Sequence, residues 1–140
     1  MKMVTLIIGK KGSGKTKKLI QRANEAVARS SGNVVVIDKG AKLTYDVTHK
    51  ARLIDTDAYG VKGYDMLYGF IGGICAGNYD VTDIFVDSTF KIATEGVAGI
   101  EAFVTKLNEL EKETEANITL LVSAGEEALP SGLSAVCEEI

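Results

Sequence analysis

One stretch near the start of the chain combines residue types that could hold a phosphate group. It follows the pattern G-x-x-x-x-G-K-T and consists of Gly9, Lys10, Lys11, Gly12, Ser13, Gly14, Lys15 and Thr16. The three glycines allow backbone conformations that a side chain would forbid, so the loop amides can turn inward around an anion. Lys15 can reach the β- and γ-phosphates of a nucleotide as a point charge, and the Thr16 hydroxyl can bind Mg²⁺. Lys10 and Lys11 lie inside the loop, so we expect at least one of them to contact phosphate.

The segments on either side of this loop are those that a phosphate-binding loop needs. Residues 3–8 form a short apolar, β-branched run, which is typical of a buried strand. In residues 17–29 apolar side chains recur at helical spacing, which predicts an amphipathic helix. The start of that helix near Gly14 would add unpaired amides and the positive end of its dipole. With this context the chain resembles the P-loop NTPases, which implies that it binds a nucleoside triphosphate with Mg²⁺. ATP is the default, because no residue pattern identifies the base.

A second candidate group lies at the end of a later apolar run. Residues 84–86 are Ile-Phe-Val and are followed by Asp87. This resembles the Walker B element of the same family, whose Asp holds Mg²⁺ together with the P-loop hydroxyl. Asp38, which also ends an apolar run, is the main rival for the role, and an acid that only caps a strand end is the structural alternative. The resemblance therefore implies a metal site made by Thr16 and Asp87.

The residue after Asp87 departs from the ATPases that the chain resembles most, those of recombination, secretion and DNA translocation. In these proteins a Glu often follows the Walker B Asp and activates water, whereas this chain has Ser88. Glu95 is the candidate replacement if the intervening loop folds back; otherwise it is an acid in the first turn of a helix, interacting with the dipole. Ser123, at the end of the last apolar run, has the position of the polar sensor residue that hydrogen-bonds near the γ-phosphate. Lys91 is a further candidate for phosphate contact, although a solvated surface charge is the simpler interpretation.

The apolar runs predict strands and helices that alternate along the chain. Strands are expected at residues 3–8, 34–37, 52–55, 81–87 and 117–123, and helices at residues 17–29, 64–76 and 95–115 and in a short closing segment after Gly125. Residues 43–47 are undecided. This alternation predicts one nucleotide-binding domain, residues 1–140, with a three-layer α/β/α sandwich around a mostly parallel sheet of four to five strands, the P-loop NTPase fold. Ligands of such sheets bind beyond the carboxyl ends of the strands, where Asp38, Asp87 and Ser123 all fall.

Composition limits the classes of protein to which the chain can belong. Its 140 residues are 46% hydrophobic and 25% charged, which fits one soluble globular domain with little room for a separate substrate domain. A net charge of -3 gives no electrostatic case for nucleic-acid binding. No apolar run reaches the ~20 residues of a membrane span and no signal peptide precedes the first strand, so we expect a cytoplasmic protein. Cys75 and Cys137 are predicted to be small buried residues and not a disulfide.

These observations favour a small ATP-binding protein that is a slow or partner-dependent Mg-ATPase. None of the three arginines, Arg22, Arg29 and Arg52, has an obvious position beside the phosphates. A protein partner or a second copy of the chain is therefore expected to supply one. Two alternatives stay open: an ATP-dependent regulator or assembly subunit with little hydrolysis, and a small-molecule kinase. The kinase is disfavoured by the lack of an Arg-rich lid, and a GTPase by the lack of an N/T-K-x-D element.

Overall fold

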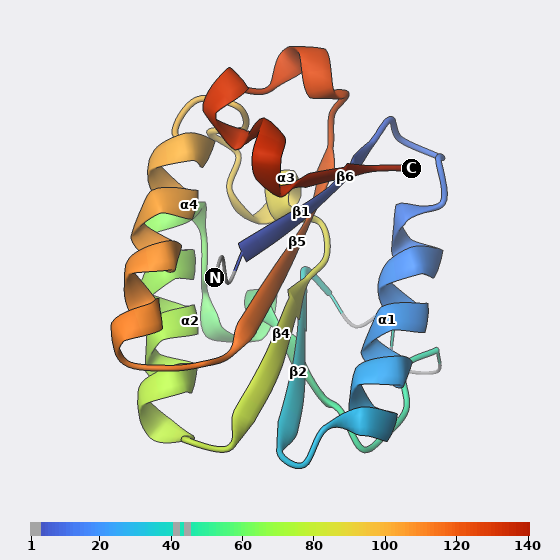
Figure 1. The fold of residues 1–140 in the computed structure, drawn as a ribbon, viewed down its shortest axis with the longest axis vertical. Helices are drawn as coiled ribbons and strands as arrows, with labels where there is room; N and C mark the ends of the chain where they lie inside the picture. Colours follow the sequence, from blue (N-terminus) through green and yellow to red (C-terminus); the bar gives the residue numbers. More distant parts are fainter. Residues whose placement is uncertain (1–3, 41–42, 44–45) are drawn as a thin grey trace.

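A six-stranded sheet runs through the computed structural model, which describes residues 4–40, 43 and 46–140 (Figure 1). The strands are β1 (Val4–Gly9), β2 (Asn33–Asp38), β3 (Arg52–Asp55), β4 (Val81–Val86), β5 (Asn117–Ser123) and β6 (Cys137–Glu139). Their order across the sheet is β3-β2-β4-β5-β1-β6, and each neighbouring pair is parallel. β5 therefore lies between β1, which leads into the glycine-rich loop, and β4, which ends just before Asp87.

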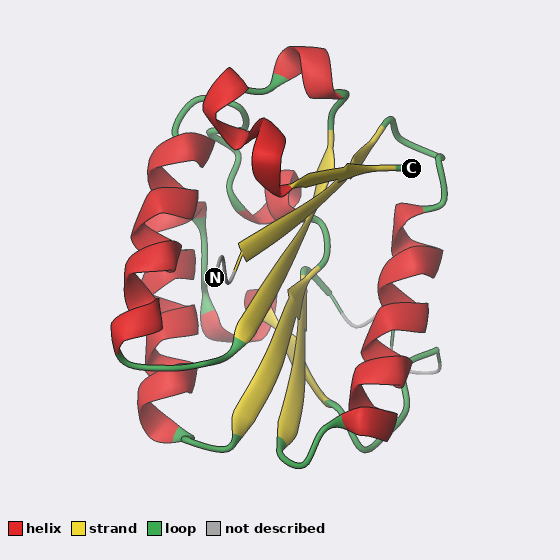
Figure 2. Cartoon of the chain, viewed as in Figure 1, coloured by secondary structure: helices red, strands yellow, loops and turns green. Residues whose placement is uncertain are grey.

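Helices cover both faces of this sheet (Figure 2). α1 (Lys15–Arg29) lies on one face, and α2 (Gly63–Gly77) and α4 (Ile100–Glu109) lie together on the other. α3 (Thr89–Ile92) is a single turn directly after β4. Short 3₁₀ segments span Thr56–Tyr59, Leu110–Lys112, Glu126–Ala128 and Ser131–Val136. The predicted α/β/α sandwich is confirmed. None of the helices in the described part of the chain has the length and apolar character needed to cross a membrane.

Alternate residues of the central strands pack into two separate hydrophobic cores, one on each face of the sheet. In β1, Leu6 and Ile8 belong to the core beneath α2 and α4, whereas Ile7 belongs to the core beneath α1. In β4, Ile84 and Phe85 divide in the same way. Because both faces of the sheet are covered, both sets of side chains are apolar, which explains why the strands are continuous apolar runs in the sequence. The strand ends that carry the candidate site are therefore anchored on both sides.

The sheet has one strand more than the upper limit of the four to five that the sequence predicts. After Gly125, where a closing helix was expected, the chain forms two 3₁₀ segments on either side of Pro130 and then β6. β6 pairs with β1 in parallel, with Leu6 opposite Cys137. The buried side chains of Leu133 and Val136 are spaced by three residues, a spacing that 3₁₀ and α-helices share, and β6 is too short to show strand periodicity.

The other sequence-based boundaries differ mainly at one helix. The helix predicted at residues 95–115 begins only at Ile100, because Gly99 has a φ of +93° and a helix cannot continue through that left-handed conformation. It ends at Glu109 and is followed by one 3₁₀ turn. The helix at 64–76 and the strands at 52–55, 81–87 and 117–123 are confirmed within a residue or so. Residue 3 and part of the undecided segment 43–47 lie outside the described residues.

Candidate functional site

A pocket of about 530 Å³ lies at the carboxyl edge of the sheet. It brings together seven of the site residues proposed from sequence: Lys11, Gly12, Gly14, Lys15, Thr16, Asp87 and Ser123. They come from three segments that are far apart in the chain, namely the loop between β1 and α1, the end of β4 and the end of β5. The parallel sheet is responsible, because it places the carboxyl ends of β1, β5 and β4 side by side.

The remaining loop residues face a different cavity. Gly9, Lys10 and Ser13 line a pocket of about 400 Å³ that also includes Glu127, Glu139 and other residues near the end of the chain. In this region Gly9 donates its amide hydrogen to the carbonyl of Ala124, 3.0 Å away. The loop is thus a wall between two cavities, and only one of them contains Lys15, Thr16 and Asp87.

The loop turns into α1 at Gly14, whose φ is +93°. That left-handed conformation directs the chain abruptly into the helix, and a residue with a side chain would adopt it only under strain. Within the described residues no side chain caps the N-terminus of α1. The first amides of α1 therefore remain available to an anion, and the helix dipole favours negative charge at the same position.

Lys15 is buried at the base of this loop. Its Nζ donates hydrogen bonds to the carbonyl oxygen of Lys10, 2.9 Å away, and to the hydroxyl oxygen of Ser13, 3.4 Å away. Burial lowers the pKa of Lys15 because it disfavours the charged form, and the negative charge of Asp87 opposes this shift without cancelling it. An anion bound next to Lys15 would stabilise the same ammonium group that burial destabilises.

Thr16 and Asp87 face one another across the pocket. The Thr16 hydroxyl donates to Asp87 Oδ2 over 3.4 Å, and Asp87 Oδ1 accepts the amide hydrogen of Ser88 at 2.8 Å. The backbone of Asp87 is held as well, since its amide donates to the carbonyl of Ile37 at 2.8 Å. A hydroxyl and a carboxylate are hard oxygen ligands of the kind that Mg²⁺ prefers, so the two residues fit that ion.

Two other acids considered from sequence lie elsewhere. Asp38 is fully buried at the end of β2, where its Oδ1 accepts the amide hydrogen of Lys39, and it does not line the pocket. Across the described residues, no group of three or more His, Cys, Asp or Glu side chains is arranged to hold a metal ion. Within the pocket, Thr16 and Asp87 are the hydroxyl and the carboxylate that a hydrogen bond brings together, so they are the candidate ligands of a cation.

The structure does not bring Glu95 to the pocket. Its carboxylate accepts the amide hydrogen of Tyr64 at 3.3 Å, in the first turn of α2. The Tyr64 hydroxyl in turn donates to the carbonyl of Gly96, so the loop containing Glu95 is tied to α2. Burial, reinforced by the charge of Glu95, raises the pKa of Tyr64 well above its ordinary value. Glu95 thus accepts a hydrogen bond at the N-terminus of α2, where its negative charge suits the helix dipole. The alternative considered from sequence, an acid in the first turn of its own helix, is wrong, because that helix begins only at Ile100.

Five further residues line the pocket, and of these the sequence offers only Lys91 as a candidate for phosphate contact. Ser88, Phe90 and Lys91 contribute to the wall formed by β4 and α3, while Lys17 and Leu121 add to the other two segments. Lys91, which was interpreted mainly as a solvated surface charge, is exposed but lines the pocket. Its position one helical turn after Asp87 is the signal available in the sequence, because residues that directly follow the end of a strand stay close to it.

Comparisons with known proteins bear on the fold. No protein-family model matches the chain, and no curated protein matches its sequence. Among solved structures it is similar to the pCW3 conjugation coupling protein TcpA, in a monomer form with ATPγS, with a TM-score of 0.59 and 14% sequence identity. The match covers 99% of this chain and 49% of that one, so the chain spans about half the length of this structure. By its fold the chain is an α/β protein of the P-loop-like kind.

Proposed function

We propose that this chain binds ATP with Mg²⁺ and hydrolyses it slowly, or at an appreciable rate only with a partner. The observation that carries the proposal is the pairing of Thr16 with Asp87, 3.4 Å apart, in the pocket that also contains the buried Lys15. A lysine, a hydroxyl and a carboxylate at these positions are the side chains that hold a metal-bound triphosphate in P-loop proteins. The fold shared with TcpA, described in a form with ATPγS, adds support.

The phosphates would be held by the backbone and by Lys15. The uncapped amides at the start of α1 and the loop before it can donate to phosphate oxygens. Lys15 would exchange its contact with the Lys10 carbonyl for the β- and γ-phosphates, whose negative charge stabilises an ammonium that burial destabilises. Because the Lys15 ammonium is poorly solvated before the nucleotide binds, its contact with phosphate would add to the affinity for the nucleotide.

Thr16 and Asp87 would hold the magnesium ion. When bound, Mg²⁺ neutralises charge on the β- and γ-phosphates, which makes the terminal phosphorus easier to attack. Asp87 is kept in place by the amide of Ser88, which donates to its carboxylate, and by its own amide, which donates to the carbonyl of Ile37. A carboxylate oriented in this way needs little rearrangement to bind a cation.

Slow hydrolysis is proposed because the pocket lacks a second acid. Asp87 is the one carboxylate among its described lining residues, Ser88 follows it, and Glu95 is bound to the amide of Tyr64. The arginines lie elsewhere: Arg22 pairs with Glu138, Arg29 with Asp83, and Arg52 lines a groove beside α2. The same features support the regulator alternative, in which ATP binding alone is the function, and offer nothing to a kinase that closes an Arg-rich lid.

The test measures nucleotide binding and phosphate release on the same preparations. Calorimetric titration of Mg·ATP into the protein, and into Lys15→Ala, should show binding that the variant loses. Phosphate release is then followed over a wide range of protein concentration; release that rises faster than the concentration indicates a second copy in catalysis. Binding without release would favour the regulator. Absence of Mg·ATP binding at every concentration would refute the proposal.

A further inference from the structure

We propose that Lys91, on the one-turn helix α3, binds the γ-phosphate of the nucleotide from the side of the pocket facing the P-loop. The inference rests on the proposed function and extends it to a residue that distinguishes a triphosphate from a diphosphate. It would make the chain itself the source of a second positive charge at the terminal phosphate, in addition to that of Lys15.

The position of α3 is set by buried side chains. Thr89, Ile92 and Ala93 are almost completely buried, at 0%, 3% and 0% exposure. The carbonyl of Ser88 accepts the amide hydrogens of Lys91 at 2.9 Å and of Ile92 at 3.1 Å. The backbone of this turn is therefore anchored to the core, although the turn is too short to be stable alone.

The same turn directs its other residues to the pocket. Ser88, Phe90 and Lys91 line the pocket, together with Asp87. Because β5 lies between β1 and β4, the loop after β1 and the turn after β4 approach the pocket from opposite sides of the end of β5. Figure 1 shows α3 beside β5. A ligand seated on the P-loop would thus have Lys91 on its far side.

The side chains that line the pocket carry an excess of positive charge, which favours the binding of an anion. Four lysines line it, Lys11, Lys15, Lys17 and Lys91, against the single carboxylate of Asp87. In the described part of the chain no carboxylate forms an ion pair with Lys91. An exposed, unpaired ammonium on a fixed backbone keeps its charge for a ligand and loses little backbone entropy on binding one.

The place of Lys91 in the pocket selects the terminal phosphate. Asp87 and Thr16 would hold the cation, whose positive charge would offset the negative charge of the β- and γ-phosphates. Lys91 follows Asp87 by one helical turn, so its side chain starts next to that end of the phosphate chain. The α-phosphate and the base would lie further along the pocket. A diphosphate would leave Lys91 without its ligand.

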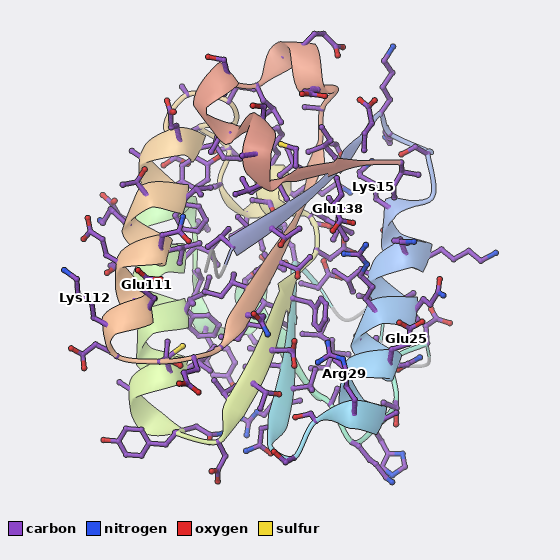
Figure 3. All side chains as sticks on the ribbon, viewed as in Figure 1. Lys15, Glu25, Arg29, Glu111, Lys112 and Glu138 are labelled. Atoms are coloured by element: carbon purple, nitrogen blue, oxygen red, sulfur yellow. The ribbon has the colours of Figure 1, made fainter. Side chains whose placement is uncertain are left out.

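The experiment compares Mg·ATP with Mg·ADP by calorimetric titration at one fixed ionic strength. In Lys91→Ala, we expect ATP affinity to fall about tenfold and ADP affinity to stay within about twofold, the loss of one charge-assisted hydrogen bond. Lys91→Arg keeps the charge and should keep most of the preference for ATP. Lys112→Ala is the matched control, because Lys112 is an exposed lysine on the far side of the molecule from Lys15 (Figure 3).

The outcomes separate this inference from the proposed function. If the wild-type protein binds neither nucleotide, both fail together. If it binds ATP and Lys91→Ala leaves the ratio of ADP to ATP dissociation constants unchanged, whether both affinities fall or neither does, the assignment of Lys91 is overturned and the proposed function stands. Circular dichroism of each variant identifies misfolding, and a misfolded Ala variant leaves the decision to Lys91→Gln.

Discussion

The Thr16 hydroxyl donates a hydrogen bond to Asp87 Oδ2 at 3.4 Å, across 71 residues of sequence. The bond joins the first turn of α1 to the end of β4. The two elements come within reach of one another because β5 alone separates β4 from β1, the strand that leads into α1. Both residues have other reasons to be held in place, since Thr16 is fixed by its helix and Asp87 by the amide of Ser88. The distance between these two residues is therefore set by the order of the strands in the sheet.

The first prediction concerns the metal. Thr16→Ala removes one of the two side chains proposed to bind Mg²⁺, so Mg·ATP affinity should fall by about tenfold, the order expected for one lost polar contact to a charged group. Binding of ATP with EDTA present should be the same in both proteins. Thr16→Ser keeps the hydroxyl and is the control. Equal loss of affinity with and without Mg²⁺ would mean that Thr16 acts on the phosphates and not through the ion.

The second prediction concerns the charge of Lys15. Its folded-state pKa is lowered because burial disfavours the charged form, so the protonated ammonium destabilises the folded protein. As the pH rises from the folded-state pKa towards the unfolded value, the unfolded chain binds more protons, so wild-type stability rises relative to a chain without this group. Lys15→Met should therefore have the higher Tm near pH 7, and the difference should shrink by pH 10. A difference that widens with pH would contradict the assignment.

The third prediction compares two glycines. Gly14 has a φ of +93°, so Gly14→Ala should lower the free energy of unfolding by about 1–2 kcal/mol through backbone strain. Gly69 lies within α2, and a Cβ at that position would meet no atom within 4 Å. Gly69→Ala should therefore raise the free energy of unfolding by about 1 kcal/mol through helix propensity. Urea unfolding measures both, and the opposite signs make each variant the control for the other.

The fourth prediction assigns Glu95 to the stability of α2. Glu95→Gln keeps an acceptor for the Tyr64 amide but loses the charge at the helix N-terminus, so stability should fall by about 0.5 kcal/mol. Affinity for Mg·ATP and the rate of phosphate release should not change. A large loss of release with normal binding would instead support the base role considered from the sequence, and would require the loop of residues 93–99 to move towards the pocket.

The glycine-rich loop illustrates what could be predicted locally. Strand, loop and helix are adjacent in sequence, so the β1–loop–α1 unit follows from a few consecutive residues and their periodicity. The same is true of β2, β4 and β5, whose continuous apolar runs indicate strands that are covered on both faces. The α/β sandwich follows from their alternation with helices.

Other features depended on contacts that sequence patterns do not record. β6 is three residues long, and its pairing with Leu6 and its neighbours in β1 has no periodic signal. Glu95 was placed near the phosphates on the assumption that its loop folds back, but the amide of Tyr64 and the buried Tyr64 ring hold that loop to α2. For Lys91 the sequence favours a solvated surface charge over phosphate contact, whereas the structure shows a side chain that is exposed and also lines the pocket.

The sequence alone determined the local units and the residue types they contain: a glycine-rich loop with Lys15 and Thr16 between a strand and a helix, and Asp87 at the end of a later strand. These are decided by residue types within one turn or one strand. The tertiary structure decided which acid faces Thr16, because the order β4-β5-β1 brings Asp87 to the pocket and leaves Asp38 buried beside it. Strand order is a balance of packing over the whole sheet, so no short stretch of sequence contains it.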